Sequence, residues 1–285
     1  MNSSQTITTM NARRPKDRRI EISGLTMHYL EWGVNTCQPI LLLHGFLSQA
    51  HIWDGFASSF SSDYHLLALD QRGHGGSDWS SDGDYSIDDH FTDIAGLIEL
   101  LDLRDLILIG HSMGGRNALF YTACIPDRIE KLILVDARPG NSNQSIQALK
   151  NLLDGFSFES DDFDDLIQKA ETLYPHLSLK ASFDLIRSSL NRAVSHSSFY
   201  KYDPWLIIAS QLADYMVDEL WPFMESIPCP TLVVRGEYST FLSQEEAEGM
   251  GQLIPDSEIV VIPRASHLPM LENSTAFKKA IISFL

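Results

Sequence analysis

The chain has 285 residues, of which 44% are hydrophobic and 21% charged, as in a soluble globular protein with one large domain or a core with an insertion. Its 21 basic and 38 acidic residues give a formal net charge of −17. A negative field of this size repels nucleic acids and anionic membranes, so we expect neither as a partner.

The N-terminal region, residues 1–17, is polar and has no apolar segment of the kind found in secretory signals. We expect it to be a disordered tail, with a basic transit peptide or tether as the alternative. No apolar run reaches the roughly 20 residues that a membrane span needs. Three cysteines without CxxC spacing, Cys37, Cys124 and Cys229, favour a reducing compartment over a disulfide framework or zinc site. The expected location is therefore cytoplasmic.

The first third of the chain reads as strands. Segments 20–22 and 27–32 alternate in hydrophobicity around Ser23-Gly24, which predicts a hairpin. Segments 39–43 and 64–69 are continuous apolar runs, typical of strands buried on both faces of a parallel sheet. The first run ends in His44-Gly45-Phe46, and the second leads into the glycine-rich segment 70–78.

The middle of the chain continues with alternating helices and strands. Segment 87–101 has helical spacing, and Ser86 before it is a suitable N-cap. The apolar run 106–110 is a strand that passes directly into a helix ending near Pro126. The next buried strand is 131–135, and Asp136 stands at its C-terminal end.

The alternation stops between residues 138 and 227, where helical, polar segments predict four helices (145–153, 162–173, 179–194 and 204–224). It resumes with a strand at 230–236, a helix at 243–253, a strand at 258–262 and a last helix at 271–285. We therefore expect an α/β protein with a doubly wound, mostly parallel sheet. Its core would comprise 18–137 and 228–285, and a helical cap, 138–227, would follow the sixth strand.

The turn Gly110-His111-Ser112-Met113-Gly114-Gly115 joins a predicted strand to a predicted helix. A serine flanked by glycines in so sharp a turn presents its hydroxyl above the sheet edge, where backbone N–H groups and the helix N-terminus face whatever it attacks. The segment thus predicts a nucleophile elbow with Ser112 as the nucleophile.

A serine hydroxyl is a poor nucleophile at neutral pH and needs a neighbouring base, which a third group orients. His267 suits the role of base because it follows the late strand 258–262 and precedes a helix. The remaining histidines lie within the elbow, at element starts or in the cap, and suit the role less well.

With these segments in order, the sequence from about Arg19 to Leu285 resembles the α/β-hydrolases with a mobile cap. The segments that carry the resemblance are His44-Gly45-Phe46, the run from Asp70 to Asp78, Gly110 to Gly115, and Gly236 with Ser266-His267. The resemblance implies that the backbone N–H groups of Phe46 and Met113 form the oxyanion hole. It also implies that Asp70, Arg72, His74 and Asp78 hold a structural turn.

The acid of the triad is where the chain departs from the usual pattern of the family. Most members place it three residues beyond a glycine like Gly236, but this chain has Ser239 there. Asp136 matches the placement used by another branch, which includes hydrolases of enamide substrates. We favour Asp136 as the acid and keep Glu237 as the alternative.

These residues predict a serine hydrolase that works without a cofactor or metal and acts on a small-molecule substrate as a monomer or homodimer. Ser112, His267 and Asp136 would cleave an ester, lactone, amide or enamide, or carbon–carbon bond through an acyl-enzyme. One alternative is a small-molecule receptor of the same fold with slow or single turnover. Another is an enzyme that uses the same triad for lyase or perhydrolase chemistry.

Overall fold

In a computed structural model, the structure describes residues 14–140, 143–155, 163–192, 198–207 and 219–285. Eight strands form one sheet in the order β1-β2-β4-β3-β5-β6-β9-β10. They are β1 (Lys16–Ile22), β2 (Leu25–Trp32), β3 (Pro39–Leu43), β4 (His65–Leu69), β5 (Leu106–His111), β6 (Ile129–Val135), β9 (Thr231–Gly236) and β10 (Ser257–Ile262). β1 and β2 are antiparallel to their neighbours, and the strands from β4 to β10 run parallel. The predicted fold class is confirmed.

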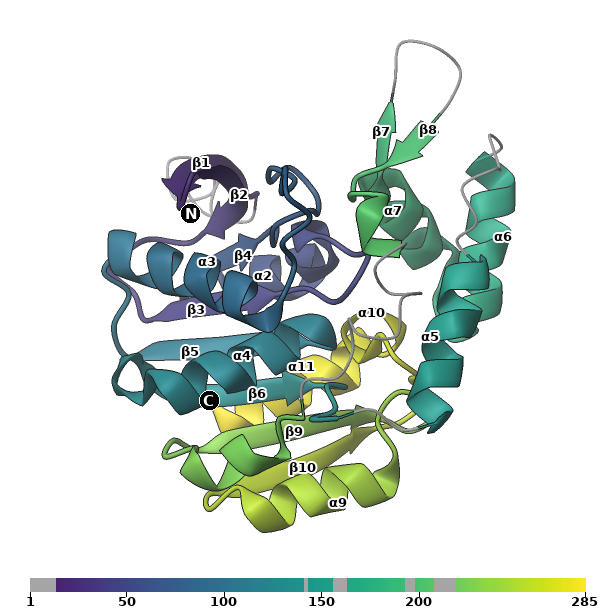
Figure 1. Ribbon diagram of the computed structural model, residues 1–285. Coiled ribbons are helices and arrows are strands. Elements are labelled where there is room, and N and C mark those ends of the chain that lie inside the picture. Colours follow the sequence, from purple (N-terminus) through teal and green to yellow (C-terminus); the bar gives the residue numbers. More distant parts are fainter. Residues whose placement is uncertain (1–13, 141–142, 156–162, 193–197, 208–218) are drawn as a thin grey trace, which may run out of the picture.

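Helices cover both faces of the sheet (Figure 1). Side chains on one face of the central strands, such as Leu41 and Leu43, pack with α3 (Ile87–Leu100), α4 (Met113–Cys124) and α9 (Gln244–Leu253). Side chains on the other face, such as Ile40 and Leu42, pack with α2 (Asp54–Phe60), α10 (Pro269–Glu272) and α11 (Ser274–Phe284). Because strand side chains alternate between faces, continuous apolar runs supply both cores.

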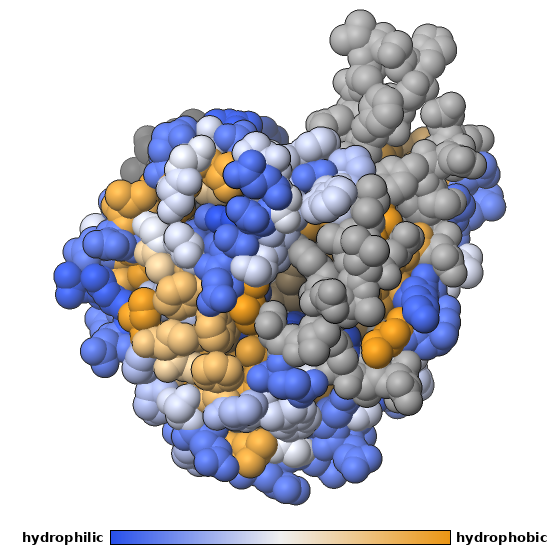
Figure 2. All heavy atoms as spheres, in the orientation of Figure 1, coloured by the Kyte–Doolittle hydropathy of each residue, from blue (hydrophilic) through white to orange (hydrophobic). Residues whose placement is uncertain are grey.

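Short elements complete the core. Two 3-10 helices, η1 (Ala50–Trp53) and η2 (Pro126–Arg128), precede α2 and β6, and a third, η4 (Trp221–Ser226), precedes β9. Hydrophilic side chains cover most of the periphery of the face seen in Figure 2, and hydrophobic ones gather nearer its centre over α3 and α4. Within the described ranges, no helix has the length and apolar character needed to cross a membrane.

The cap lies beside the carboxyl ends of the strands and contains α5 (Asn143–Gly155), α6 (Phe163–Leu173) and α7 (Leu179–Ser189) (Figure 1). A two-stranded hairpin of β7 (Leu190–Arg192) and β8 (Ser198–Tyr200) follows α7. The cap has a small core of its own that includes Leu166, Ala170 and Ile186. It is tied to the loop after β4, because Gly75 N–H donates to the Lys201 carbonyl and Asp203 N–H to the Gly73 carbonyl.

Four boundaries differ from the sequence-based expectation. β1 starts at Lys16, so the core begins two residues before position 18, because residues 16–22 pair with β2. The helix expected over 179–194 ends at Ser189, where the chain turns into β7. Of the helix expected over 204–224, residues 208–218 lie outside the described part and 221–226 form η4. The last helix is divided at Asn273, which caps α11.

Residues 219–227 belong to the core rather than to the cap. Leu220, Met224 and Ile227 are buried in the cluster that α3, α4 and α9 form on the sheet. Leu220 N–H also donates to the Pro139 carbonyl, which joins the two ends of the insertion. Apolar residues at these positions pack into the main core, so the described part of the cap ends earlier than position 227.

Candidate active site

The nucleophile elbow lies between β5 and α4. Ser112 has φ at 52° and ψ at −118°, values that a residue with a side chain rarely adopts, and it is the N-cap of α4. Its N–H donates to the Val135 carbonyl, and its own carbonyl accepts from Gly115 and Arg116. Backbone hydrogen bonds on both sides thus hold the strained turn in place.

The loop after β3 lies against the elbow, and this close approach requires glycine on both sides. A Cβ atom on Gly45 would lie 2.7 Å from His111 Nδ1, and one on Gly114 would lie 2.5 Å from the His44 carbonyl oxygen. Because such distances are shorter than contact, larger residues would push the loop and the elbow apart. The glycines therefore bring Phe46 and Ser112 to the same place.

Three side chains from separate strand ends form a hydrogen-bonded chain. His267 Nε2 lies 3.1 Å from Ser112 Oγ, and His267 Nδ1 lies 2.7 Å from Asp136 Oδ2. His267 follows β10, Ser112 follows β5 and Asp136 follows β6. Since the carboxyl ends of parallel strands meet at one edge of the sheet, the three residues come together there. This is the relative placement expected for nucleophile, base and acid.

The two carboxylate oxygens of Asp136 accept further hydrogen bonds. Oδ1 accepts from the Gly236 N–H at 3.1 Å, and Oδ2 accepts from the Ser239 hydroxyl at 2.6 Å. Burial raises the pKa of Asp136, and the donors Ser239 and Gly236 oppose that rise. Burial lowers the pKa of His267, which favours the neutral imidazole that a general base requires.

The alternative acid, Glu237, does not contact His267. Its Oε2 accepts from the Arg264 N–H at 2.8 Å, in the loop after β10. Ser239, at the position where most of the family carries the acid, is instead hydrogen-bonded to Asp136. The structure thus brings Asp136 to the base and keeps Glu237 in the neighbouring loop.

The amides expected to bind an oxyanion face the same cavity as Ser112. Met113 is the first residue of α4, so its N–H has no acceptor within the helix. Among the backbone hydrogen bonds of the described residues outside helices and strands, neither the Phe46 nor the Met113 amide is a donor. Both residues line the cavity, as expected of residues whose N–H groups would donate to a negatively charged oxygen.

The cavity has a volume of about 470 Å³, within the range of small-molecule sites. Its apolar lining comes from the cap and from the loops near the triad, and includes Leu149, Leu185, Phe241 and Leu268. Its polar lining comes from the loop before α3 and the first turns of α3 and α4, and includes Ser86, Asp89, His90, Arg116 and Asn117.

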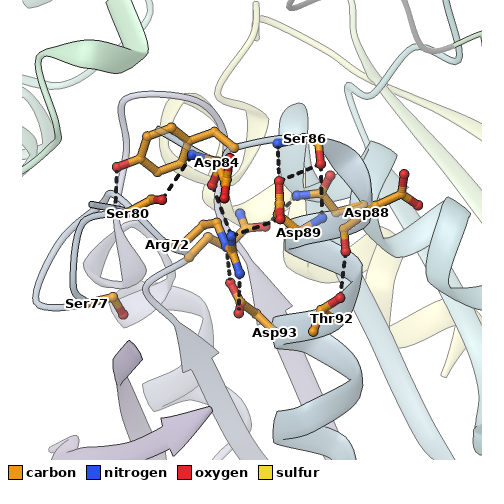
Figure 3. A network of polar contacts seen from close by, with 12 residues as sticks. Arg72, Ser77, Ser80, Asp84, Ser86, Asp88, Asp89, Thr92 and Asp93 are labelled. Atoms are coloured by element: carbon orange, nitrogen blue, oxygen red, sulfur yellow. Dashed lines mark hydrogen bonds and ion pairs between the residues drawn. The ribbon is translucent and has the colours of Figure 1, made fainter. Parts of the chain in front are cut away.

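A set of ion pairs holds the polar wall of the cavity (Figure 3). Arg72 donates to both oxygens of Asp93, at 2.6 and 2.8 Å, and to the carbonyl of Asp84 at 3.0 Å. Asp89 accepts from the backbone N–H and the hydroxyl of Ser86, which forms a capping box at the start of α3. These contacts join the loop after β4 to α3 and fix the residues of both segments that line the cavity.

The segment 70–78 serves structural contacts, as the resemblance implied. Asp70 accepts from the Ala50 and Gly76 amides and lies 2.7 Å from His28 Nδ1. Asp78 accepts from the Thr26 N–H. His74 Nε2 accepts from the Leu47 N–H and Nδ1 contacts the Arg72 carbonyl, so this imidazole supports the loop next to Phe46.

Sequence reasoning missed two residues of the site. His90 is 4% exposed and lines the cavity, and its imidazole forms no hydrogen bond with a described residue. Phe241 stacks on the His267 ring with the ring centroids 3.8 Å apart. His90 lies one turn into a predicted helix and could have been noticed as a polar residue on its buried side. Phe241 carried no such signal, because only the folded loop after β9 brings it to His267.

Comparison with known proteins supplies independent information. A family model described as "alpha/beta hydrolase fold" matches residues 38–274. The 2-(acetamidomethylene)succinate hydrolase of Mesorhizobium japonicum is 30% identical over 275 residues, which cover 94% of this chain and 94% of the relative. The human monoacylglycerol lipase ABHD6 is 26% identical over 259 residues, which cover 86% of this chain and 74% of the relative.

A solved structure gives the same result in three dimensions. The crystal structure of E-2-(acetamidomethylene)succinate hydrolase superimposes with a TM-score of 0.86 at 28% sequence identity. The match covers 95% of this chain and 99% of the other. The similarity therefore extends over the sheet and the cap together.

Proposed function

The chain belongs to the α/β-hydrolase family and is a serine-type hydrolase, and from this premise we propose that Ser112, His267 and Asp136 cleave a small carbonyl substrate without a cofactor. The single observation that carries the proposal is the buried series of contacts from Ser112 Oγ through His267 to Asp136 Oδ2, at one wall of the cavity. Burial favours the neutral imidazole of His267, which is the form that a general base requires.

In the first half of the reaction, Ser112 Oγ attacks the substrate carbonyl while His267 Nε2 takes its proton. Asp136 keeps the other ring nitrogen, Nδ1, protonated and stabilises the imidazolium that forms. The N–H groups of Phe46 and Met113 donate to the tetrahedral oxyanion, and a donor of this kind contributes roughly 3–4 kcal/mol to the transition state.

In the second half, His267 gives its proton to the leaving group and the acyl-enzyme forms. His267 then removes a proton from a water molecule, which attacks the acyl group and releases Ser112. Phe241 covers one face of the His267 ring and restricts its rotation during both proton transfers. All bonds made and broken in this cycle are those of an ordinary acyl transfer.

The substrate class follows from the cavity and from the relatives. By its name, the relative from Mesorhizobium acts on 2-(acetamidomethylene)succinate. We propose that this chain acts on a small ester, lactone, amide or enamide, or on a carbon–carbon bond next to a carbonyl group. The polar wall around His90 favours a substrate with a hydrogen-bonding group at the end away from the scissile carbonyl.

The test is turnover of matched aryl esters by the purified protein. We expect repeated hydrolysis of p-nitrophenyl butyrate and of the p-nitrophenyl monoester of succinate, with the polar ester preferred. Ser112→Ala should lower kcat by about 10⁶-fold, the loss typical of a missing triad nucleophile. Hydrolysis that survives Ser112→Ala would contradict the mechanism, and a single burst without turnover would favour the receptor alternative.

A further inference from the structure

Ser239 lies in the loop after β9 and is only 5% exposed. Its hydroxyl oxygen is 2.6 Å from Asp136 Oδ2, the same oxygen that lies 2.7 Å from His267 Nδ1. A single carboxylate oxygen therefore receives hydrogen bonds from the base of the triad and from this serine.

The direction of the Ser239 hydroxyl hydrogen follows from its other contacts. The oxygen accepts from the Phe241 N–H and from the Leu242 N–H, each at 3.1 Å. A hydroxyl group has one hydrogen and two lone pairs. Because the two amides occupy both lone pairs, the hydrogen must point to Asp136, so Ser239 is a fixed donor rather than a rotating one.

We propose that Ser239 is a positioning residue with two effects on Asp136. The first part of the proposal is that Ser239 keeps the Asp136 carboxylate ionised, and the second is that it holds this carboxylate turned toward His267. This inference rests on the proposed function.

The first part follows from the buried position of the acid. Burial raises the pKa of Asp136, and Ser239 is the largest influence that opposes this rise. The titratable and charged groups around the acid are His267 after β10, His111 at the end of β5 and Arg235 on β9, while Arg138 acts on His267. Without the Ser239 donor, the protonated form of the Asp136–His267 pair becomes more favourable.

The same loop also holds the base. Phe241, whose amide is bound to Ser239, stacks on His267 with the two rings 18° from parallel. The Gly236 N–H, at the start of the loop, donates to the second oxygen of Asp136. The loop between Gly236 and Leu242 thus fixes the acid through two donors and the base through one ring.

The first experiment compares the pH dependence of kcat/KM for the wild type, Ser239→Ala, Ser239→Thr and Ser243→Ala on an aryl ester. We expect Ser239→Ala to shift the ascending limb roughly one unit to higher pH and to lower kcat/KM about tenfold at neutral pH, as for loss of a donor to a charged group. Ser239→Thr keeps the hydroxyl, so the ascending limb of its kcat/KM profile should lie near that of the wild type.

Ser243→Ala is the matched control, because its hydroxyl caps α9 in the same segment without touching Asp136. It should lower thermal stability and leave the limb unchanged. A Ser239→Ala profile that coincides with that of the wild type would overturn the positioning role.

The second experiment is the Ser112→Ala control of the same assay. If the wild type itself shows no turnover that depends on Ser112, then the proposed function fails rather than this inference.

Discussion

At the scale of single residues, two backbone conformations orient the catalytic groups. Ser112 and Asp136 both have positive φ, at 52° and 46°, and each follows a central strand. Strained conformations of this kind cost about 1–3 kcal/mol and persist only where the surroundings hold them. Here the Ser112 N–H donates to Val135 and the Asp136 N–H donates to Val234. These backbone conformations therefore set the directions in which the proposed nucleophile and acid leave their strands.

The two candidate acids can be told apart by neutral substitutions. Asp136→Asn should lower kcat by about 10³–10⁴-fold, because the carboxylate that fixes the His267 tautomer is lost. Glu237→Gln should change kcat by less than about threefold, since among the described residues the Glu237 carboxylate is hydrogen-bonded to the Arg264 amide and not to His267. Steady-state kinetics with a thermal melt of each variant checks this. A larger loss in Glu237→Gln than in Asp136→Asn would contradict the assignment.

The sequence could predict some of these residues and not others. Ser112 and His267 stand in motifs that define their local turn, so their roles could be predicted from neighbouring residues alone. Asp136 and Glu237 both follow central strands that lie side by side, and only the folded loops decide which one faces the base. At position 239 the sequence shows only a serine where most of the family carries the acid. Its contact with Asp136 spans 103 residues, which no local pattern reveals.

At the scale of elements, α3 links the structural loop after β4 to the wall of the cavity. Its Ser86–Asp89 capping box starts the helix, and one turn later Asp93 is paired with Arg72. Both partners are buried, with side chains 7% and 2% exposed. Removal of one partner from a buried ion pair leaves the other charge uncompensated, which is costly.

Asp93→Asn should therefore lower the free energy of unfolding by about 3 kcal/mol. It should also raise KM, because Arg72 supports the loop at Asp84 that lines the cavity. Urea denaturation and ester kinetics measure the two effects. The matched control is Arg104→Gln, which removes an exposed pair with Asp102 and should leave the urea midpoint unchanged. Equal shifts in the two variants would contradict the prediction.

Element boundaries were predicted well where local signals are strong. Ser86 caps α3 as predicted, and both α3 and α9 begin within a residue of the expected start. The hairpin β7–β8 was missed, because it is held by distant contacts. Lys201 N–H donates to the Ser189 carbonyl, and Tyr202 bridges to His74 in the core. Such tertiary contacts override the helical preference of the segment.

At the scale of the whole molecule, several histidines are buried in the neutral form. Burial lowers the pKa of His44, His74, His90 and His111, for His74 and His111 to about 3. The unfolded chain protonates such residues near pH 6.5. His28 acts in the opposite direction, because Asp70 raises its pKa. Burial also lowers the pKa of His267 and raises that of its partner Asp136, so these two act in opposite directions. The four further histidines outweigh His28, which makes the folded protein sensitive to acid.

The sign of this effect is fixed by linkage. As pH falls below about 6.5, the unfolded state binds more protons than the folded one, so the free energy of unfolding decreases. The decrease is at most about 1.4 kcal/mol per pH unit for each such histidine. Urea midpoints at pH 7.5 and 5.5 should show this loss of stability. His90→Leu should make the loss smaller, because unfolding then takes up as much as one proton fewer. A midpoint independent of pH would contradict this account.

The insertion that forms the cap leaves and re-enters the core at neighbouring places. β6 and β9 are adjacent parallel strands, and the Leu220 N–H donates to the Pro139 carbonyl across the base of the insertion. Asp136 comes before the insertion and His267 after it, and the strands and loops of the core bring them into contact. Evolution could thus lengthen, shorten or exchange the cap while the reaction chemistry stays constant. We expect substrate range in descendants of this chain to diverge faster than catalytic mechanism.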